Sequence, residues 1–344
     1  MNSKARLIYE QVASILQEND SELRNQYAHV LPGLETMYER VHVMLKAREK
    51  RGAIDFEMTE TQFMFDENRK ISSIEPRQRN DAHRLIEEFM IAANVAAAKY
   101  LLASKLPVLY RVHEVPSVEK LSALREFLGE LGLFLGGGDE PEPGHYASLL
   151  KTVSNRPDGH LLQTVMLRSM KQAVYSPENL GHFGLGLEAY AHFTSPIRRY
   201  PDLLVHRAIK HTITKQKKAA WHYSEEAMVQ LGEHCSMASR RADEATRDVA
   251  DWLKCEYMRD RVGEVHEGVI SGVTGFGLFV ELSDIYIEGL VHVTALKNDY
   301  YQFDASGHRL MGERSRKSYR LGDSIKVKVV RVDLDEKKID LELA

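Results

Sequence analysis

Two adjacent arginines, Arg198 and Arg199, stand between two prolines in the sequence TSPIRRYPDLL. Pro196 and Pro201 both suit the first turn of a helix, where a backbone N–H has no helical partner, and Ser195 is a good N-cap. The stretch therefore predicts a short turn that leads into a helix. Free N–H groups at a helix start attract anions, and guanidinium groups bind phosphate through a planar fork. The pair is either a phosphate clamp or a solvated pair of arginines in a loop.

A second candidate surface lies near the C-terminus, where Phe276 and Phe279 are three residues apart and His292 follows on the next expected strand. Lys326 and Lys328 alternate with apolar residues on a further strand, so both are expected to face water. Aromatic rings bordered by basic side chains form a platform for unpaired bases. Alternatively, one or both phenylalanines fill a core, because strand alternation does not put positions 276 and 279 on the same face.

Hydrophobic periodicity predicts that residues 1–258 are mostly helical. The expected helices are two within residues 1–50 that break at Pro32–Gly33, others at 79–104, 117–135, 145–153 and 158–172, one after Pro201, and a long one at 223–258. Short strands are expected between residues 51 and 76, and an extended segment at 106–117. The second half of helix 79–104 is apolar on nearly every side, so it should be buried.

The pattern changes to β structure after Gly263, with a domain boundary expected at about 259–263. Five strand-like runs in some 80 residues, from GEVHEGVISG to KKIDLEL, suit a small closed barrel of the OB type. The stretch RLMGERSRKSYR, residues 309–320, is interpreted as a basic loop. The predicted fold class is therefore α+β, with a largely helical part followed by a five-stranded barrel.

The amino-acid composition limits the classes of protein to which this chain can belong. The 344 residues predict two or three domains, and 43% hydrophobic with 28% charged residues is a globular balance. The net charge of −4 means that any nucleic-acid surface must be local. Two cysteines, Cys235 and Cys255, form no CxxC pair, which argues against a zinc site and fits a reducing compartment. The chain has no run of 18 apolar residues and no signal-peptide pattern at its start, so we expect a cytoplasmic protein without a membrane partner.

Four stretches carry a family resemblance: RGAIDF (51–56), RNDAHRLIEEFMIAAN (79–94), LRSMKQAVYSPENLGHFGLGLEAYAHFTSPIRRYPDLLVHRAIK around the arginine pair, and RRADEATRDVADW (240–252). They closely resemble the RNB family of exoribonucleases, in particular its bacterial ribonuclease R members, over essentially the whole chain. The run GVISGVTGFGLFVEL…EGLVHV resembles the S1-type RNA-binding module, an OB-fold. The resemblance divides the chain into the C-terminal part of an RNB domain, residues 1–258, and an S1 barrel, residues 263–344.

The resemblance implies roles for individual residues. The arginine of the family's SPIR motif holds a phosphate at the catalytic centre and falls on Arg198, whereas Arg199 matches a more variable position. Phe56 falls where the family has an aromatic residue lining the RNA channel, although a core role is an open alternative. Glu88 falls on an acid near the nucleotide path, and by itself it is also a good first-turn acid. Glu244 is a further candidate, with an i,i+3 ion pair to a neighbouring arginine as the alternative.

The resemblance also implies the reaction, which is hydrolysis of single-stranded RNA from its 3′ end to nucleoside 5′-monophosphates. Two Mg²⁺ ions would activate water and stabilise the leaving oxygen. The family's Mg²⁺ ligands are aspartates in one short motif, and no such motif occurs here. The acid-rich stretches GGGDEPEPG and DLDEKK are interpreted as solvated turns, so the chain has no predicted metal ligands of its own. The family's N-terminal cold-shock-like domains and its Lys-rich tail have no counterpart in the sequence either.

The chain is therefore expected to be the C-terminal portion of such an enzyme, which binds single-stranded RNA but does not cleave it alone. The missing N-terminal half is an expected partner, and the intact enzyme is expected to be a monomer. The competing hypothesis is an RNA-binding remnant without any chemistry. A serine hydrolase built on Ser195 with His192 or His206 is disfavoured, because Pro196 follows the serine and no glycines flank it.

Overall fold

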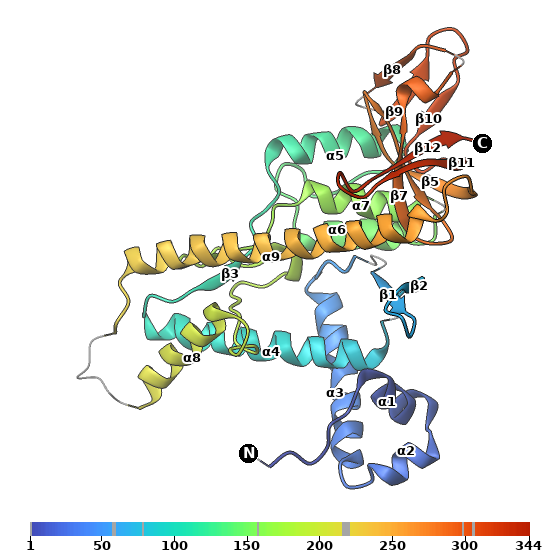
Figure 1. The fold of residues 1–344 in the computed structure, drawn as a ribbon. Coiled ribbons are helices and arrows are strands. Elements are labelled where there is room, and N and C mark those ends of the chain that lie inside the picture. The colour runs from blue at the N-terminus through green and yellow to red at the C-terminus, as the bar shows by residue number, and fades with distance from the viewer. Residues whose placement is uncertain are drawn as a thin grey trace.

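A computed structural model describes residues 2–56, 60–77, 79–156, 158–214, 221–297, 299–304 and 307–344. Helices precede a β-rich C-terminal part, as Figure 1 shows. The helices are α1 (Tyr9–Ala13), α2 (Ser21–Gln26), α3 (Leu31–Lys50), α4 (Asp81–Ser104), α5 (Val118–Glu130), α6 (Pro143–Val153), α7 (Gly159–Ser169), α8 (Tyr200–Ile213) and α9 (Glu225–Arg259). A π-helical turn, η1 (Ser14–Glu18), and two 3₁₀ turns, η2 (Phe183–Leu185) and η3 (Val293–Ala295), complete the helical elements.

The strands form a closed barrel and three smaller sheets. The barrel has the order β11-β12-β7-β6-β5, and the sheets pair β1 with β2, β3 with β4, and β10-β9-β8. The strand bounds are β1 (Thr61–Phe65), β2 (Ile71–Pro76), β3 (Tyr110–Val112), β4 (Val174–Ser176), β5 (Val265–Thr274), β6 (Gly277–Leu282), β7 (Ile287–His292), β8 (Tyr301–Asp304), β9 (Arg309–Gly312), β10 (Ser318–Arg320), β11 (Ser324–Asp333) and β12 (Lys338–Leu343). The predicted α+β class and the five-stranded barrel are confirmed.

Helix α9 is the longest element and joins the two parts of the molecule (Figure 1). Its N-cap Ser224 accepts a hydrogen bond from the backbone N–H of Ala227 at 3.2 Å. The side of its N-terminal half carrying Met228 and Cys235 packs beside β4, and its last turns carry Met258 into the barrel core. Residues 240–249 between these ends are exposed on every side. The long helix predicted for 223–258 is confirmed, and its polar middle is a bridge between two packed ends.

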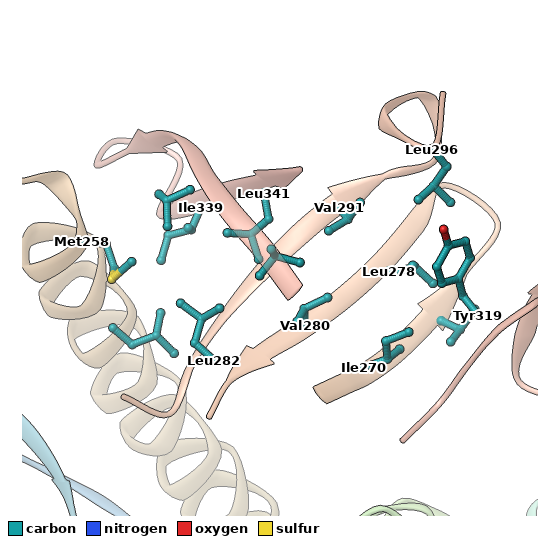
Figure 2. Packing of buried hydrophobic residues seen from close by; sticks show 14 of the residues in the cluster. Met258, Ile270, Leu278, Val280, Leu282, Val291, Leu296, Tyr319, Ile339 and Leu341 are labelled. Carbon is teal, nitrogen blue, oxygen red and sulfur yellow. The ribbon is translucent and has the colours of Figure 1, made fainter. Parts of the chain in front are cut away.

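The barrel core is not closed by barrel residues alone. Figure 2 shows Met258 of α9 pointing toward the barrel, on the side of Leu282 and Ile339. Ile74 of β2, only 4% exposed, belongs to the same buried cluster. The hairpin β1–β2 is far away in sequence, so it fastens the barrel to the helical part in addition to α9.

Several predicted elements differ from the structure. Pro32 lies in the first turn of α3, which tolerates proline because the first backbone N–H groups have no helical acceptor, so the chain breaks before it rather than at it. Tyr100 and Leu102 in the second half of α4 are 45% and 49% exposed, so that half is not buried on all sides. The stretch 309–320 is a loop only at 313–317, because its two ends form β9 and β10, which pair antiparallel.

Helix α5 ends at Glu130 rather than near residue 135. Gly132 has a φ of +67°, and its N–H donates to Gly129 O at 3.1 Å. The N–H of Leu133 donates to Leu128 O at 2.8 Å. These two hydrogen bonds make a Schellman motif, in which a glycine in the left-handed region stops the helix. The glycine that stops α5 is thus Gly132, and not the later triplet 136–138.

No helix among the described residues is long and apolar enough to cross a membrane.

Candidate functional site

The arginine pair lies in a turn directly before α8. The backbone N–H groups of Arg198 and Arg199 both donate to Ser195 O, at 3.3 and 3.0 Å. Asp202 is fully buried, and its Oδ1 accepts from the Ser195 N–H at 2.7 Å and from Arg199 Nη2 at 2.8 Å. Arg199, rather than Ser195, is the N-cap residue of α8, and Pro201 occupies the first turn as expected. The predicted N-cap role of Ser195 is therefore wrong, because its N–H and C=O instead close the turn.

The two neighbouring arginines have different environments. Arg199 is held by the ion pair with Asp202, and its side chain is 23% exposed. Arg198 is exposed, and in the part of the chain that the structure describes its guanidinium makes no hydrogen bond or ion pair. Ile197 beside it is fully exposed. Arg198 is therefore available to an outside anion, whereas Arg199 has a structural partner.

Aromatic and imidazole rings lie beside this turn. The Tyr175 hydroxyl and His192 Nδ1 form a hydrogen bond at 2.8 Å, and the rings of Tyr190 and His192 are 5.7 Å apart and nearly perpendicular. Asn94 of α4 donates to the Tyr190 hydroxyl at 2.9 Å and accepts from the Phe193 N–H at 2.9 Å. These bonds fix residues 190–193, so the chain enters the arginine turn in one defined conformation.

The rings are neutral in a strongly positive environment. Burial, assisted by the charges of Arg199 and Arg111 and more weakly by Arg198, lowers the pKa of His192 to about 3. Burial together with His113 and Arg111 lowers the pKa of His182 to about 3 as well. At neutral pH the positive charge of this region therefore belongs to the arginines and not to the histidines. Sequence reasoning missed this ring cluster, although the alternation of rings in EAYAHF is a visible signal.

Glu88 and Phe56 lie in packed surroundings. Glu88 is 3% exposed, and its Oε1 accepts from Arg48 Nη1 at 2.6 Å. Phe56 is half-buried and packs against the cluster formed by α5, α6 and α7. The structure thus gives Glu88 a buried ion pair, and a contact of either residue with a ligand stays a prediction.

Glu244 lies on the exposed middle of α9. Neither Arg240 nor Arg247 comes within ion-pair distance of it in the described residues, so the alternative interpretation as a helical ion pair is wrong. This middle stretch carries Arg240, Arg241 and Arg247 together with Asp243, and its Asp248 forms an ion pair with Lys337 of the turn between β11 and β12. Glu244 is thus accessible, and its role stays a prediction.

Phe276 and Phe279 lie together, with ring centroids 5.9 Å apart and planes at 88°. Phe276 is 49% exposed and Phe279 is half-buried. Strand alternation does not separate them, because Phe276 belongs to the turn before β6 and is outside the strand register. His292 is exposed at the end of β7, opposite Gly277 of β6, so it borders the same turn.

A cavity of about 530 Å³ contains both rings and lies between the barrel and the last turns of α9. Lys254, Lys337 and Lys338 line it together with Asp251, Glu288 and Asp340, and sequence reasoning missed the three lysines. Lys337 forms an ion pair with Asp248, and Lys338 forms one with Glu336 at 3.2 Å. Lys326 is exposed but bonds Glu267 at 3.2 Å and lines a different hollow. Lys328 is exposed on the same strand as Lys326. The predicted platform therefore has its two rings and lysines beside them, but these are not the lysines at 326 and 328.

No group of three or more His, Cys, Asp or Glu side chains within the described ranges could hold a metal ion. Asp333 in the stretch DLDEKK accepts from the Glu336 N–H at 3.0 Å, as a turn residue between β11 and β12 does. The side chains that the structure describes therefore do not fit a divalent-metal site.

The family model of the RNB domain matches residues 1–215. The chain belongs to the RNB family. A second family model, the S1 RNA binding domain, matches residues 259–344, which include the closed barrel. The RNB exoribonucleases are generally dependent on divalent metals.

Named relatives are similar over the whole chain. Ribonuclease R of Escherichia coli (strain K12) is 57% identical over 351 residues, which cover 100% of this chain and 43% of the relative. Ribonuclease R of Vibrio cholerae serotype O1 is 56% identical over 352 residues, which cover 100% of this chain and 43% of the relative. The structure of Mycoplasma genitalium RNase R in complex with ribose methylated single-stranded RNA has a TM-score of 0.91 and 28% identity, and the match covers 99% of this chain and 54% of that one. The chain thus spans about half, or less, of the length of these RNB relatives.

Proposed function

We propose that this chain is the C-terminal, RNA-binding part of a 3′→5′ exoribonuclease. The enzyme would degrade single-stranded RNA to nucleoside 5′-monophosphates. The observation that carries the proposal is the pair of arginines before α8, where Arg199 is bound to Asp202 and Arg198 has no ion pair among the described residues. A guanidinium in this position binds a phosphate through two parallel N–H donors. Ribonuclease R relatives with 56–57% identity and the S1 match support RNA as the ligand.

The barrel supplies the second contact with the strand. Phe276 and Phe279 stack on bases without regard to sequence, and Lys254, which forms no ion pair among the described residues, attracts the backbone beside them. Helix α9 holds this platform at a fixed distance from the arginine turn (Figure 1). An RNA strand that contacts both would run along the exposed middle of α9, where Glu244 lies.

The hydrolytic chemistry is proposed to need a polypeptide segment that is not among these 344 residues. Carboxylates that hold Mg²⁺ in the working enzyme have no counterpart among the described side chains. When bound, such ions would activate the attacking water and stabilise the leaving oxygen. This chain contributes the binding of the RNA strand and the contact of a phosphate with Arg198. We further propose a cytoplasmic enzyme that is monomeric when intact.

The test is a binding and cleavage experiment with the chain alone. A 5′-labelled single-stranded RNA should be bound, with an affinity that falls steeply with salt because phosphate contacts release counterions. With Mg²⁺ added, no shortened RNA ladder should form. Failure to bind RNA, or Mg²⁺-dependent release of mononucleotides by the chain alone, would overturn the proposal.

A second candidate function is an RNA-binding protein without chemistry. The absence of a three-residue metal cluster in the described part of the chain agrees with it as well as with the first. The two candidate functions differ in one experimental outcome. If the chain only binds RNA, adding a polypeptide that carries the family's aspartate motif does not lead to cleavage of the bound RNA.

A further inference from the structure

A small sheet in the S1 part is attached to the barrel by one of its faces. Strands β8, β9 and β10 lie outside the closed barrel and project from it on the side away from α1–α4 (Figure 1). Tyr301, Leu310 and Tyr319 are buried in the barrel core, and Figure 2 shows Tyr319 among the core residues. Because successive side chains of a strand point to opposite faces, the other face of the sheet, with Gln302 and Arg320, is open to solvent.

The turn between β9 and β10, residues 313–317, has a fixed backbone. The Asp299 carboxylate accepts from the N–H groups of Arg314 at 3.0 Å and Ser315 at 2.6 Å, and from the Ser315 hydroxyl at 2.7 Å. The Ser315 N–H is the largest of the causes that lower the pKa of Asp299 to about 2, so the carboxylate stays an acceptor at neutral pH. The turn is therefore held in one conformation without using the side chains of its basic residues.

Three cations of this turn are not used by the fold. Arg314, Arg316 and Lys317 are exposed, and none of them forms an ion pair in the part of the chain that the structure describes. Glu313 is the acid of the turn, and it accepts a hydrogen bond from Gln302 at 2.6 Å. The turn thus presents positive charge that the protein itself does not neutralise, which favours an anionic ligand.

An exposed aromatic ring lies beside the turn. Tyr300 is 72% exposed, although its backbone is fixed on both sides. Its N–H donates to Asp299 Oδ1 at 2.8 Å, and its C=O accepts from the Glu313 N–H at 2.9 Å. Among the described residues its ring stacks on no other ring. Solvated surface charge does not require such a ring, whereas an unpaired base would stack on it.

Further rings connect Tyr300 to the base platform. Phe303 of β8 is 42% exposed and lies beside the turn before β6, where a Cβ on Gly275 would be 3.9 Å from the Phe303 Cβ. Gly275 directly precedes Phe276, which is 49% exposed. Positions 300 and 303 are about 10 Å apart along an extended chain. Exposed rings therefore follow one another from Phe276 and Phe279 to the basic turn.

We propose that the sheet β8–β10 extends the base platform, with Tyr300 stacking on an additional unpaired base and Arg314 and Arg316 binding phosphates of the same strand. The proposal rests on the proposed function. A single strand is favoured over a duplex, because bases in a duplex are covered by their stacked neighbours and only unpaired bases can be splayed onto rings. It is favoured over an acidic protein, because the rings lead directly from the platform and each nucleotide of a strand offers both a base and a charge.

The test measures binding of oligouridylates of two lengths to the whole chain at several salt concentrations. An OB-type fold covers roughly 4–16 nucleotides, so strands of about 6 and about 20 nucleotides distinguish the platform from the platform with the sheet. The double variant Arg314→Gln/Arg316→Gln should bind the long strand about tenfold more weakly or worse. Its slope of log affinity against log salt should fall by about 1.4, since each phosphate of a single strand contributes about 0.7. Tyr300→Ala should lose about fivefold or more for the long strand.

The short strand and two control variants define the background. All variants should bind the short strand as the unaltered chain does, because the platform and the arginine turn remain. Arg6→Gln/Arg40→Gln removes the same net charge from two exposed arginines that have no ion pair in the described ranges. Phe134→Ala removes a ring that is 79% exposed. Both controls should keep affinity and slope, and thermal unfolding should be unchanged throughout, because every altered side chain is exposed.

Several results would overturn the proposal. Unchanged affinity of the sheet variants for the long strand would do so, and so would equal losses for the two lengths, because the sheet would then not extend the site. Losses of affinity that follow losses in unfolding temperature would make these side chains structural. Normal binding of single strands with weaker binding of an RNA duplex would assign the sheet to a duplex. Normal RNA binding with weaker binding of a polypeptide carrying the family's aspartate motif would assign it to a protein.

The extension and the proposed function fail in different ways. If Arg198→Ala loses affinity and the sheet variants do not, the extension is wrong and the proposed function stands. If the unaltered chain binds neither length of RNA, the proposed function fails and the extension fails with it.

Discussion

At the scale of single residues, the adjacent arginines Arg198 and Arg199 differ in their interactions. Arg199 neutralises the buried Asp202, and Arg198 has no partner among the described residues. The sequence could predict a turn, a helix and a pair of guanidinium groups there. It could not predict which arginine is paired, because that depends on the burial of Asp202 three residues later, which is set by packing around α8.

Alanine variants of the two arginines should therefore separate stability from binding. Arg199→Ala leaves a buried carboxylate without its cation and should lower the free energy of unfolding by about 2–4 kcal/mol. Arg198→Ala should leave that free energy within about 0.5 kcal/mol, because the side chain is exposed, and should weaken RNA binding. Urea unfolding and RNA titration of both variants measure this. Equal losses of stability in the two variants would contradict the assignment.

Two half-buried histidines make stability depend on pH. His192 and His182 have folded-state pKa values of about 3, below the ordinary value near 6.5. Between these values the unfolded chain binds more protons than the folded one, so stability is complete above pH 6.5 and is lost as pH falls toward 3. In urea unfolding between pH 5 and 6.5, the free energy of unfolding of His192→Gln should rise with pH less steeply than that of the unaltered chain, by about 1 kcal/mol per pH unit. An unchanged slope would show that His192 is not kept neutral.

At the scale of elements, local rules predicted long helices well and their ends poorly. Helix α9 and the barrel strands follow from strong periodicity and a good N-cap. The end of α5 was missed because four glycines follow within eight residues of Glu130, and only tertiary packing decides which of them takes the left-handed conformation. The sheet β8–β10 was missed because its charged residues resemble those of a loop.

Two glycines of α5 provide a matched test of helix termination. Gly129 is helical and Gly132 has a φ of +67°, and a Cβ at either position meets no atom within 4 Å. Gly129→Ala should raise the free energy of unfolding by about 0.5–1 kcal/mol, since glycine is the weaker helix former. Gly132→Ala should lower it by about 1–2 kcal/mol, since an L-residue is strained in that conformation. Thermal or urea unfolding gives both signs, and a gain in stability at Gly132 would rule out the Schellman motif.

The turn before β6 brings the two barrel phenylalanines together. If Phe279 stacks on a base, Phe279→Ala should weaken RNA binding by ~1–3 kcal/mol, as stacking on one base does. Phe134 is 79% exposed in the loop after α5, so Phe134→Ala is a control that removes the same ring elsewhere. Fluorescence titration with a short RNA measures the difference. Equal affinities of the two variants would place Phe279 outside the path of the strand.

At the scale of the whole molecule, distant segments hold the barrel against the helical part. Met258 of α9 (Figure 2) and Ile74 of the hairpin β1–β2 belong to the barrel core, and Leu321 packs against the cluster of α5, α6 and α7. Sequence reasoning separated the two parts correctly as helical and β-rich. It did not predict the hairpin contact, because neither local period nor composition tells which surface an exposed hairpin covers. This contact fixes the base platform relative to the arginine turn, on which the proposed RNA path depends.

The central claim is that the chain holds the strand while carboxylates from elsewhere complete the site. The most direct measurement is degradation of a labelled single-stranded RNA with Mg²⁺, first by the chain and then after addition of a polypeptide carrying the family's aspartate motif. We expect no nucleotide release by the chain alone, release of 5′-monophosphates after addition, and a lower rate with Arg198→Ala. RNA that remains bound and uncleaved after addition would contradict the claim and leave an RNA-binding protein without chemistry.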